Sequence, residues 1–174
     1  KRKGLDKLIN AHSNLSKEKE LCLLIAGDGD FKSECEDLVK NLKLNNVIFT
    51  GSVHPKDRSI YFSQCDIFVL PSYFEKGVVE AWGLTVNEAM QFSKPVISTT
   101  AVGAAYDLID GKNGIMVEEN NVYKLEKAIK KVIDNEYSKK IKNNGNEIIG
   151  LYTYENMANQ FIKAINIAFR NDYI

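Results

Sequence analysis

The sequence lacks the features that direct a protein to nucleic acid or into a membrane. Its 174 residues carry 23 Lys and Arg against 23 Asp and Glu, so no overall charge attracts nucleic acid or an anionic surface. The apolar runs are only a few residues long, too short to span a bilayer, and no signal peptide opens the chain. We therefore expect a cytoplasmic protein that does not bind nucleic acid.

Cysteine and histidine are also scarce. Cys22, Cys35 and Cys65 form no CxxC pair, and the first and third of them flank apolar runs. These two are expected to be small core residues in a reducing compartment. With only His12 and His54, the sequence predicts no metal site. His12 continues an apolar helical face, whereas His54 follows a predicted strand, where a ligand contact and a structural role are both open.

Short apolar runs alternate with helical patterns along most of the chain. Strand-like runs cover 21–27, 46–51, 66–72, 94–99 and 113–118, and helical patterns cover 31–42, 55–63 and a stretch from Leu84. The first run, LCLLIAG, is typical of a strand buried on both faces. Strands and helices alternating in this way predict an α/β fold with a doubly wound, mostly parallel, Rossmann-like sheet.

The last third of the chain is expected to be helical. It carries two apolar stripes at helical spacing, and Thr153 is a candidate N-cap for the final helix. The stripes are Val122, Leu125, Ile129, Val132 and Ile133, then Met157, Phe161, Ala164, Ile165 and Ala168. We expect a single domain over 1–174, with a core over 1–135 and a helical tail over 136–174. The opening KRKGLDKLINAH is already helical in pattern, with no preceding strand or cap, which suggests a piece of a longer protein.

Ligands of doubly wound sheets bind beyond the carboxyl ends of the strands. In the stretch EAWGLTVNEAM, which follows the third predicted strand, Glu80 precedes a predicted helix and Glu88 lies within it. The first turn of that helix, GLT at 83–85, would attract an anion through its N–H groups and dipole. If the whole stretch were helical, the two carboxylates would lie roughly 12 Å apart along the axis. This spacing suits a ligand with hydroxyls at both ends and phosphate between, although a solvated helix with two acids is an equally weighted alternative.

The stretch EAWGLTVNEAMQFSKPVIST resembles the E-x7-E signature of retaining, two-domain (GT-B) glycosyltransferases, those of the glycosyl transferases group 1 or family 4 type. Further motifs occur in the order of that family: Lys3-Gly4, LLIAGDGDF, NVIFTGSV, DIFVLPSYFE and AVGAAYDLIDGKNGIMV. The resemblance covers about residues 1–135. It implies that the chain is the nucleotide-sugar-binding, C-terminal half of a GT-B fold, and that the N-terminal acceptor domain is absent from it.

The resemblance implies a role for each matching side chain. Glu80 would hold hydroxyls of the donor sugar, and Glu88 would hold those of the ribose. Lys3 would neutralise the charge that grows on the leaving phosphate. The donor would be a UDP-, GDP- or ADP-sugar, with no cofactor and no metal.

Backbone groups complete the implied site. The N–H groups of Gly83, Leu84 and Thr85 would receive the diphosphate, and the main chain at Val53 would meet the nucleobase. Two further glycines follow the first predicted strand and would either admit the ligand or simply end that strand. They are Gly27 and Gly29.

The sequence departs from the family pattern at several positions. Ala104 and Tyr106 replace the second Gly and the Pro of a GGxPE loop, and Asp107 stands where many members carry Glu, with its role left open. Glu75 could compete with Glu80 for the first acidic role, although the Trp-Gly that follows Glu80 favours the latter. The family's phosphate-binding Arg has no counterpart unless Arg2 replaces it.

The function implied is retaining transfer of a hexose to a glycan or lipid acceptor that the missing domain would bind, so this domain alone is expected to transfer no sugar. The alternatives are a non-catalytic nucleotide-binding module, or an epimerase or phosphorylase of the same architecture. The final helix would dock toward the missing domain, and Trp82 would anchor its loop or form a sugar platform. Peripheral membrane contact of the full-length protein is a further expectation, for which a weak signal comes from Lys139, Lys140 and Lys142.

Overall fold

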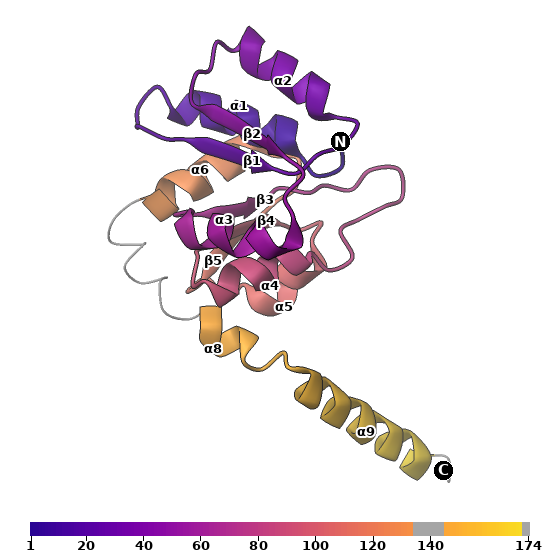
Figure 1. Cartoon of the computed structure of the whole chain (residues 1–174). Coiled ribbons are helices and arrows are strands. Elements are labelled where there is room, and N and C mark those ends of the chain that lie inside the picture. The colour runs from indigo at the N-terminus through magenta and orange to yellow at the C-terminus, as the bar shows by residue number, and fades with distance from the viewer. Residues whose placement is uncertain (134–144, 172–174) are drawn as a thin grey trace.

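The computed structural model describes residues 1–133 and 145–171. The strands are β1 (Leu23–Ala26), β2 (Val47–Gly51), β3 (Phe68–Leu70), β4 (Val96–Thr99) and β5 (Gly114–Val117). The helices are α1 (Leu5–Leu15), α2 (Lys32–Asn41), the 3-10 helix η1 (Pro55–Asp57), α3 (Arg58–Gln64), α4 (Leu84–Gln91), α5 (Gly103–Leu108), α6 (Val122–Ile133), α8 (Gly145–Ile149) and α9 (Tyr154–Asn171). Figure 1 shows these elements as a layered α/β body from which α9 extends.

All strand pairs within the two hydrogen-bonded groups are parallel. β1 pairs with β2, and β3, β4 and β5 pair in that order. The alternation of strands and helices explains this topology, because each helix returns the chain to the edge where the next parallel strand begins. The predicted α/β fold with a parallel, doubly wound sheet is confirmed. The strand hydrogen bonds form two separate groups, one of β1 and β2 and one of β3, β4 and β5.

Helices cover both faces of this arrangement. On one side α1 and α6 bury Leu8, Leu15 and Leu125 against Ile97 of β4 and Val117 of β5. α2 joins α1 over β1 and β2. On the other side α4 and α5 bury their apolar faces against β3 and β4, with α3 and α8 at the margin. Burial of these faces from water is the main force that fixes the strand ends, on which the site is built.

Burial of the first strand differs from the prediction. Leu24 is 46% exposed, and its register partner Ile48 on β2 is 51% exposed. α1 and α2 pack over the side that carries Ile25, so the alternate side, which also holds Cys22, stays open. The expectation of a strand buried on both faces is therefore wrong for β1, although β4 is buried throughout. Cys22 is exposed rather than a core residue, Cys65 is half-buried, and the cysteine in the core is Cys35 of α2.

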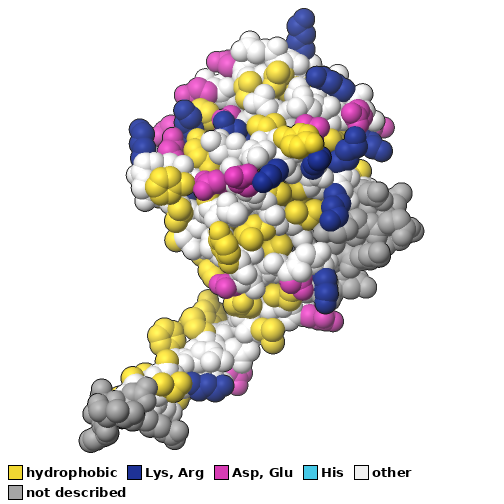
Figure 2. All heavy atoms as spheres, turned by 180° about the vertical axis from the view of Figure 1, so that it is seen from behind, with side chains coloured by type: hydrophobic (Ala, Val, Ile, Leu, Met, Phe, Trp, Pro, Cys, Tyr) yellow, Lys and Arg dark blue, Asp and Glu magenta, His cyan; other side chains and the backbone are white. Residues whose placement is uncertain are grey.

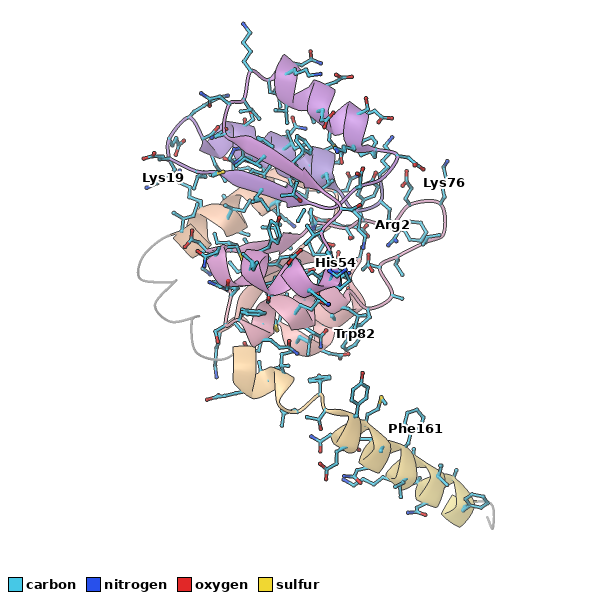
Figure 3. The ribbon with its side chains drawn as sticks, viewed as in Figure 1. Arg2, Lys19, His54, Lys76, Trp82 and Phe161 are labelled. Atoms are coloured by element: carbon cyan, nitrogen blue, oxygen red, sulfur yellow. The ribbon has the colours of Figure 1, made fainter. Side chains whose placement is uncertain are left out.

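The final helix begins where the sequence predicts. The Thr153 hydroxyl accepts a hydrogen bond from the Asn156 N–H at 3.1 Å, as an N-cap does. The apolar stripe of α9 lies outside the body, with Met157, Phe161 and Ile165 all more than half exposed (Figures 2 and 3). The docking of this helix onto another domain stays a prediction.

Two predictions fall on residues without a described structure. The boundary between core and tail at 135–136 lies outside the described residues, as do Lys139, Lys140 and Lys142. Within the described ranges, no helix has the length and apolar character needed to cross a membrane.

Candidate functional site

The first four residues lie along the end of β3. The Tyr73 N–H donates to the Arg2 carbonyl at 3.0 Å. Gly4 begins α1 in the left-handed conformation, with φ at 70°, and a Cβ at this position would lie 2.0 Å from the Pro71 carbonyl oxygen. Only glycine satisfies both conditions. The Lys3-Gly4 motif therefore has a structural explanation: Gly4 permits a close contact with Pro71 that holds Lys3 and Arg2 over the carboxyl end of β3.

The backbone of Glu80 is fixed from the other side. Its N–H donates to the Ala101 carbonyl and its carbonyl accepts from the Gly103 N–H, both at 3.0 Å. A Cβ on Gly103 would lie 2.1 Å from the Ala81 carbonyl oxygen. The chain before α4 thus lies tightly against the chain that follows β4, and this contact directs the Glu80 side chain toward the N-terminal segment.

Three charged side chains meet at this point. The Lys3 Nζ and the Arg2 Nη1 both donate to Oε2 of Glu80, the arginine at 3.0 Å, and Arg2 also donates to the Val79 carbonyl at 3.3 Å. The Glu80 side chain is only 16% exposed. Burial by itself raises the pKa of Glu80, but the hydrogen bonds and charges of Lys3 and Arg2 outweigh it and hold the pKa below its ordinary value.

The competing glutamate lies elsewhere. Glu75 pairs with Val78 through two backbone hydrogen bonds of 3.1 and 3.0 Å, which close a hairpin turned by Lys76 and Gly77 at positive φ. Glu80 is the carboxylate that contacts Lys3 and Arg2. The geometry therefore favours Glu80 over Glu75 as the first acidic residue of the motif.

The first turn of α4 presents backbone donors beside this cluster. Gly83 precedes the helix at φ 95° and makes no side-chain cap, and a Cβ there would lie 2.9 Å from Val102 Cγ1. The first N–H groups of a helix have no partner within the helix. The hydrogen bonds recorded for the described residues include none from the N–H groups of Leu84 or Thr85. Both can receive an anion, which the helix dipole also favours.

Glu88 lies one turn further along α4. Its Oε1 accepts from the Arg58 Nη1 at 3.2 Å, while its Oε2 is buried and without a hydrogen-bond partner among the described residues. A buried carboxylate oxygen without a donor is costly unless a ligand satisfies it. Arg58 was not predicted as part of the site, because its place at the start of α3 has no spacing relationship to the motif.

The remaining predicted residues line the ends of β1 and β2. Gly27 and Gly29 have φ values of 137° and 155°, and no atom lies within 4 Å of a Cβ added to either. The Gly27 N–H donates to the Gly51 carbonyl at 2.9 Å, so this glycine ends the strand. Val53 is half-buried between β2 and η1, and the next residue, His54, caps η1 by accepting from the Lys56 N–H at 3.3 Å. In the view of Figure 3, His54 lies below Arg2 and above Trp82.

The residues that depart from the family pattern after β4 lie in a short helix, α5, where a loop was expected. The Ala104 N–H donates to the Trp82 carbonyl at 2.8 Å, so it is occupied internally. Trp82 is an anchor: its Nε1 donates to Asn87 at 2.8 Å, and its ring lies 6.2 Å from that of Tyr152. Asp107 is exposed, and its carbonyl accepts from the Tyr152 hydroxyl at 3.2 Å.

Two hollows lie away from this cluster. One, of about 470 Å³, lies between the end of α4, α8 and the start of α9, and the other, of about 310 Å³, lies between β5 and α6. His12 is buried on α1, consistent with a helix-face residue. No group of three or more His, Cys, Asp or Glu in 1–133 and 145–171 could hold a metal ion.

The fold and the strand-end cluster define an α/β domain of the GT-B type. Residues 1–148 match the family model described as glycosyl transferases group 1, and the chain belongs to this family. It is 30% identical to an uncharacterized glycosyltransferase of Methanocaldococcus jannaschii, over 88% of this chain and 41% of that protein. It is also 30% identical to O-antigen chain mannosyltransferase C of Escherichia coli, over 77% of this chain and 34% of the relative.

A solved structure agrees with this assignment. Sucrose-phosphate synthase of Thermosynechococcus elongatus superposes with a TM-score of 0.77 at 27% identity, over 97% of this chain and 43% of that one. The chain spans less than half the length of each of these relatives.

Proposed function

We propose that this chain is the donor-binding half of a retaining hexosyltransferase that uses a nucleoside-diphosphate sugar. The observation that carries the proposal is the convergence of Lys3, Arg2 and Glu80 beside the open first turn of α4. Two cations and free backbone N–H groups suit a diphosphate, and the adjacent carboxylate suits sugar hydroxyls. The family membership, and the name of the mannosyltransferase relative, support transfer of a hexose.

In this proposal the donor lies across the strand ends. The diphosphate contacts the N–H groups of Leu84 and Thr85, with Lys3 and Arg2 at its other side. The ribose hydroxyls donate to Glu88 Oε2, the buried oxygen without a partner, and the base lies by Val53. Gly27 and Gly29 leave the space beside β1 open.

The proposed reaction breaks the bond between the anomeric carbon and the phosphate oxygen. Positive charge from Lys3 and Arg2 stabilises the negative charge that develops on the leaving nucleoside diphosphate. The acceptor hydroxyl attacks from the same face and gives its proton to the leaving phosphate, so the anomeric configuration is retained. A glycosidase-type nucleophile has no role in this scheme, because Glu80 is committed to the sugar hydroxyls.

The test is a thermal-shift panel of UDP-, GDP- and ADP-sugars against this chain. A donor at 100 times its dissociation constant stabilises the folded state by about 2.7 kcal/mol. We expect one nucleotide class to raise the melting temperature and Lys3→Met to reduce that rise. If no sugar nucleotide changes the melting temperature, the proposal is refuted.

A second experiment separates an enzyme domain from a simple binding module. With donor and a glycan or lipid acceptor, this chain alone is expected to release only background nucleotide, since the acceptor side and its closure belong to another domain. A full-length protein that contains the chain should transfer the hexose, and proton NMR of the product should show retention. A full-length protein that binds donor without transfer would favour the non-catalytic module.

A further inference from the structure

Lys3 and Arg2 have two proposed partners that exclude one another, the Glu80 carboxylate and the diphosphate. Glu80 Oε2 accepts from both Lys3 and Arg2, and these are the same cations that the proposed function assigns to the diphosphate. The side chain is largely buried, at 16% exposed, while the Arg2 and Lys3 side chains are 32% and 51% exposed. The glutamate is therefore the fixed member of the cluster, and the two cations are the members with freedom to turn.

The backbone keeps Glu80 in place while the cations change partner. The hydrogen bonds to Ala101 and Gly103 hold residue 80 on both sides. Lys3 has four rotatable side-chain bonds and can move its Nζ by several ångströms without any change at Gly4. A diphosphate on the first turn of α4 can draw both cations away only by breaking their ion pairs with Glu80, which leaves a mostly buried carboxylate without donors.

We propose that Glu80 competes with the diphosphate for Lys3 and Arg2, and that a sugar on the donor relieves this competition by supplying hydroxyl donors to Glu80. The inference rests on the proposed function and assigns Glu80 a second role, selection of the intact donor over the free nucleoside diphosphate. After transfer the sugar hydroxyls are gone, so Glu80 recaptures the two cations. The hold on the nucleoside diphosphate product weakens at that moment, which favours its release.

The test is calorimetric titration of the chain with UDP, GDP and ADP, and with the glucose and mannose derivatives of the nucleotide that binds. Ion pairs of this exposure contribute about 0.2–1 kcal/mol each, so the loss of both pairs in Glu80→Gln is expected to lower the dissociation constant of the free nucleoside diphosphate by about two- to thirtyfold. The same variant should bind the sugar nucleotide more weakly, so that the ratio of its affinities for the sugar nucleotide and the free nucleoside diphosphate falls. Glu75→Gln, on the neighbouring hairpin, is the matched control and should change neither constant.

A second background distinguishes competition from simple repulsion between Glu80 and phosphate. In a chain that carries Arg2→Met and Lys3→Met, repulsion predicts that Glu80→Gln still increases the affinity for the nucleoside diphosphate. Competition predicts that Glu80→Gln no longer increases this affinity. The inference is overturned if Glu80→Gln in the original chain leaves the dissociation constant of the nucleoside diphosphate unchanged or raises it. It is also overturned if Glu80→Gln still increases the affinity in the chain without the two cations. Neither result affects the proposed function. Failure of all three nucleotides to bind the unmodified chain would overturn the proposed function as well.

Discussion

Glu88→Ala is expected to weaken nucleotide binding while it leaves the fold intact. Arg58 already occupies Oε1, and Oε2 is buried without a partner, so Oε2 is the atom available to a ribose hydroxyl. Hydrogen bonds to a charged group contribute about 1.5–3 kcal/mol. The Glu88 side chain is 32% exposed, so the lower half of that range applies, and a loss of about 2 kcal/mol raises the dissociation constant about 30-fold.

The stability of the variant separates this reasoning from a folding defect. Removal of Glu88 also removes a buried oxygen without a donor, and Arg58 is 49% exposed and can be solvated. The melting temperature is therefore expected to stay within about 2 °C, which corresponds to less than about 1 kcal/mol for a chain of this size. Glu34→Ala, an exposed glutamate on α2, is the matched control. An unchanged dissociation constant for the free nucleotide in Glu88→Ala, measured by calorimetry, would remove Glu88 from the site.

Three further predictions concern the scaffold. Gly4→Ala should lower the melting temperature by about 4–8 °C more than Gly111→Ala, because both glycines have positive φ but only a Cβ at Gly4 would meet a carbonyl oxygen. Equal decreases in melting temperature, measured by calorimetry, would contradict the packing argument. The stabilising contribution of Glu80, whose folded pKa is lowered, is present above its ordinary value of about 4.3 and is lost as pH falls through the lowered pKa. The difference in melting temperature between the unmodified chain and Glu80→Gln should thus shrink below about pH 4, and a difference independent of pH would refute the pairing. Deletion of the residues after Thr153 should change the melting temperature by less than about 2 °C, since the side chains described for α9 are exposed. Tyr152→Ala should lower the melting temperature by more, because it removes the contacts with Trp82 and Asp107. A larger decrease for the deletion than for Tyr152→Ala would show that α9 packs on the body.

The order of strands and helices could be predicted because periodicity and apolar runs are local signals. All five predicted strands are present, and Thr153 caps the final helix. The exposed side of β1 could not be predicted, because LCLLIAG is apolar throughout and only the placement of α1 and α2 decides which side is covered. α5 was missed for a similar reason: the N–H groups of Gly103 and Ala104 donate to the carbonyls of Glu80 and Trp82, contacts that no local pattern reveals.

The candidate site was predicted from motif spacing, and the structure adds the contacts between distant segments. Arg2 and Lys3 lie 78 and 77 positions from Glu80 in sequence, so their meeting depends on Gly4 and its contact with Pro71. The sequence left the choice between Glu75 and Glu80 open, and the hairpin at Lys76-Gly77 favours Glu80. Arg58 lacks any sequence signal, because its partner Glu88 lies on a helix that only the tertiary fold brings beside α3.

The most direct test of the central claim is a crystal structure of this chain with the sugar nucleotide that the thermal-shift panel selects. The account predicts diphosphate oxygens within hydrogen-bond distance of the Leu84 and Thr85 N–H groups, ribose hydroxyls at Glu88 Oε2, and a Lys3 Nζ that has left Glu80 for phosphate. A donor found instead in the hollow beside α8 and α9, with the pairs of Glu80 to Lys3 and Arg2 unchanged, would contradict it.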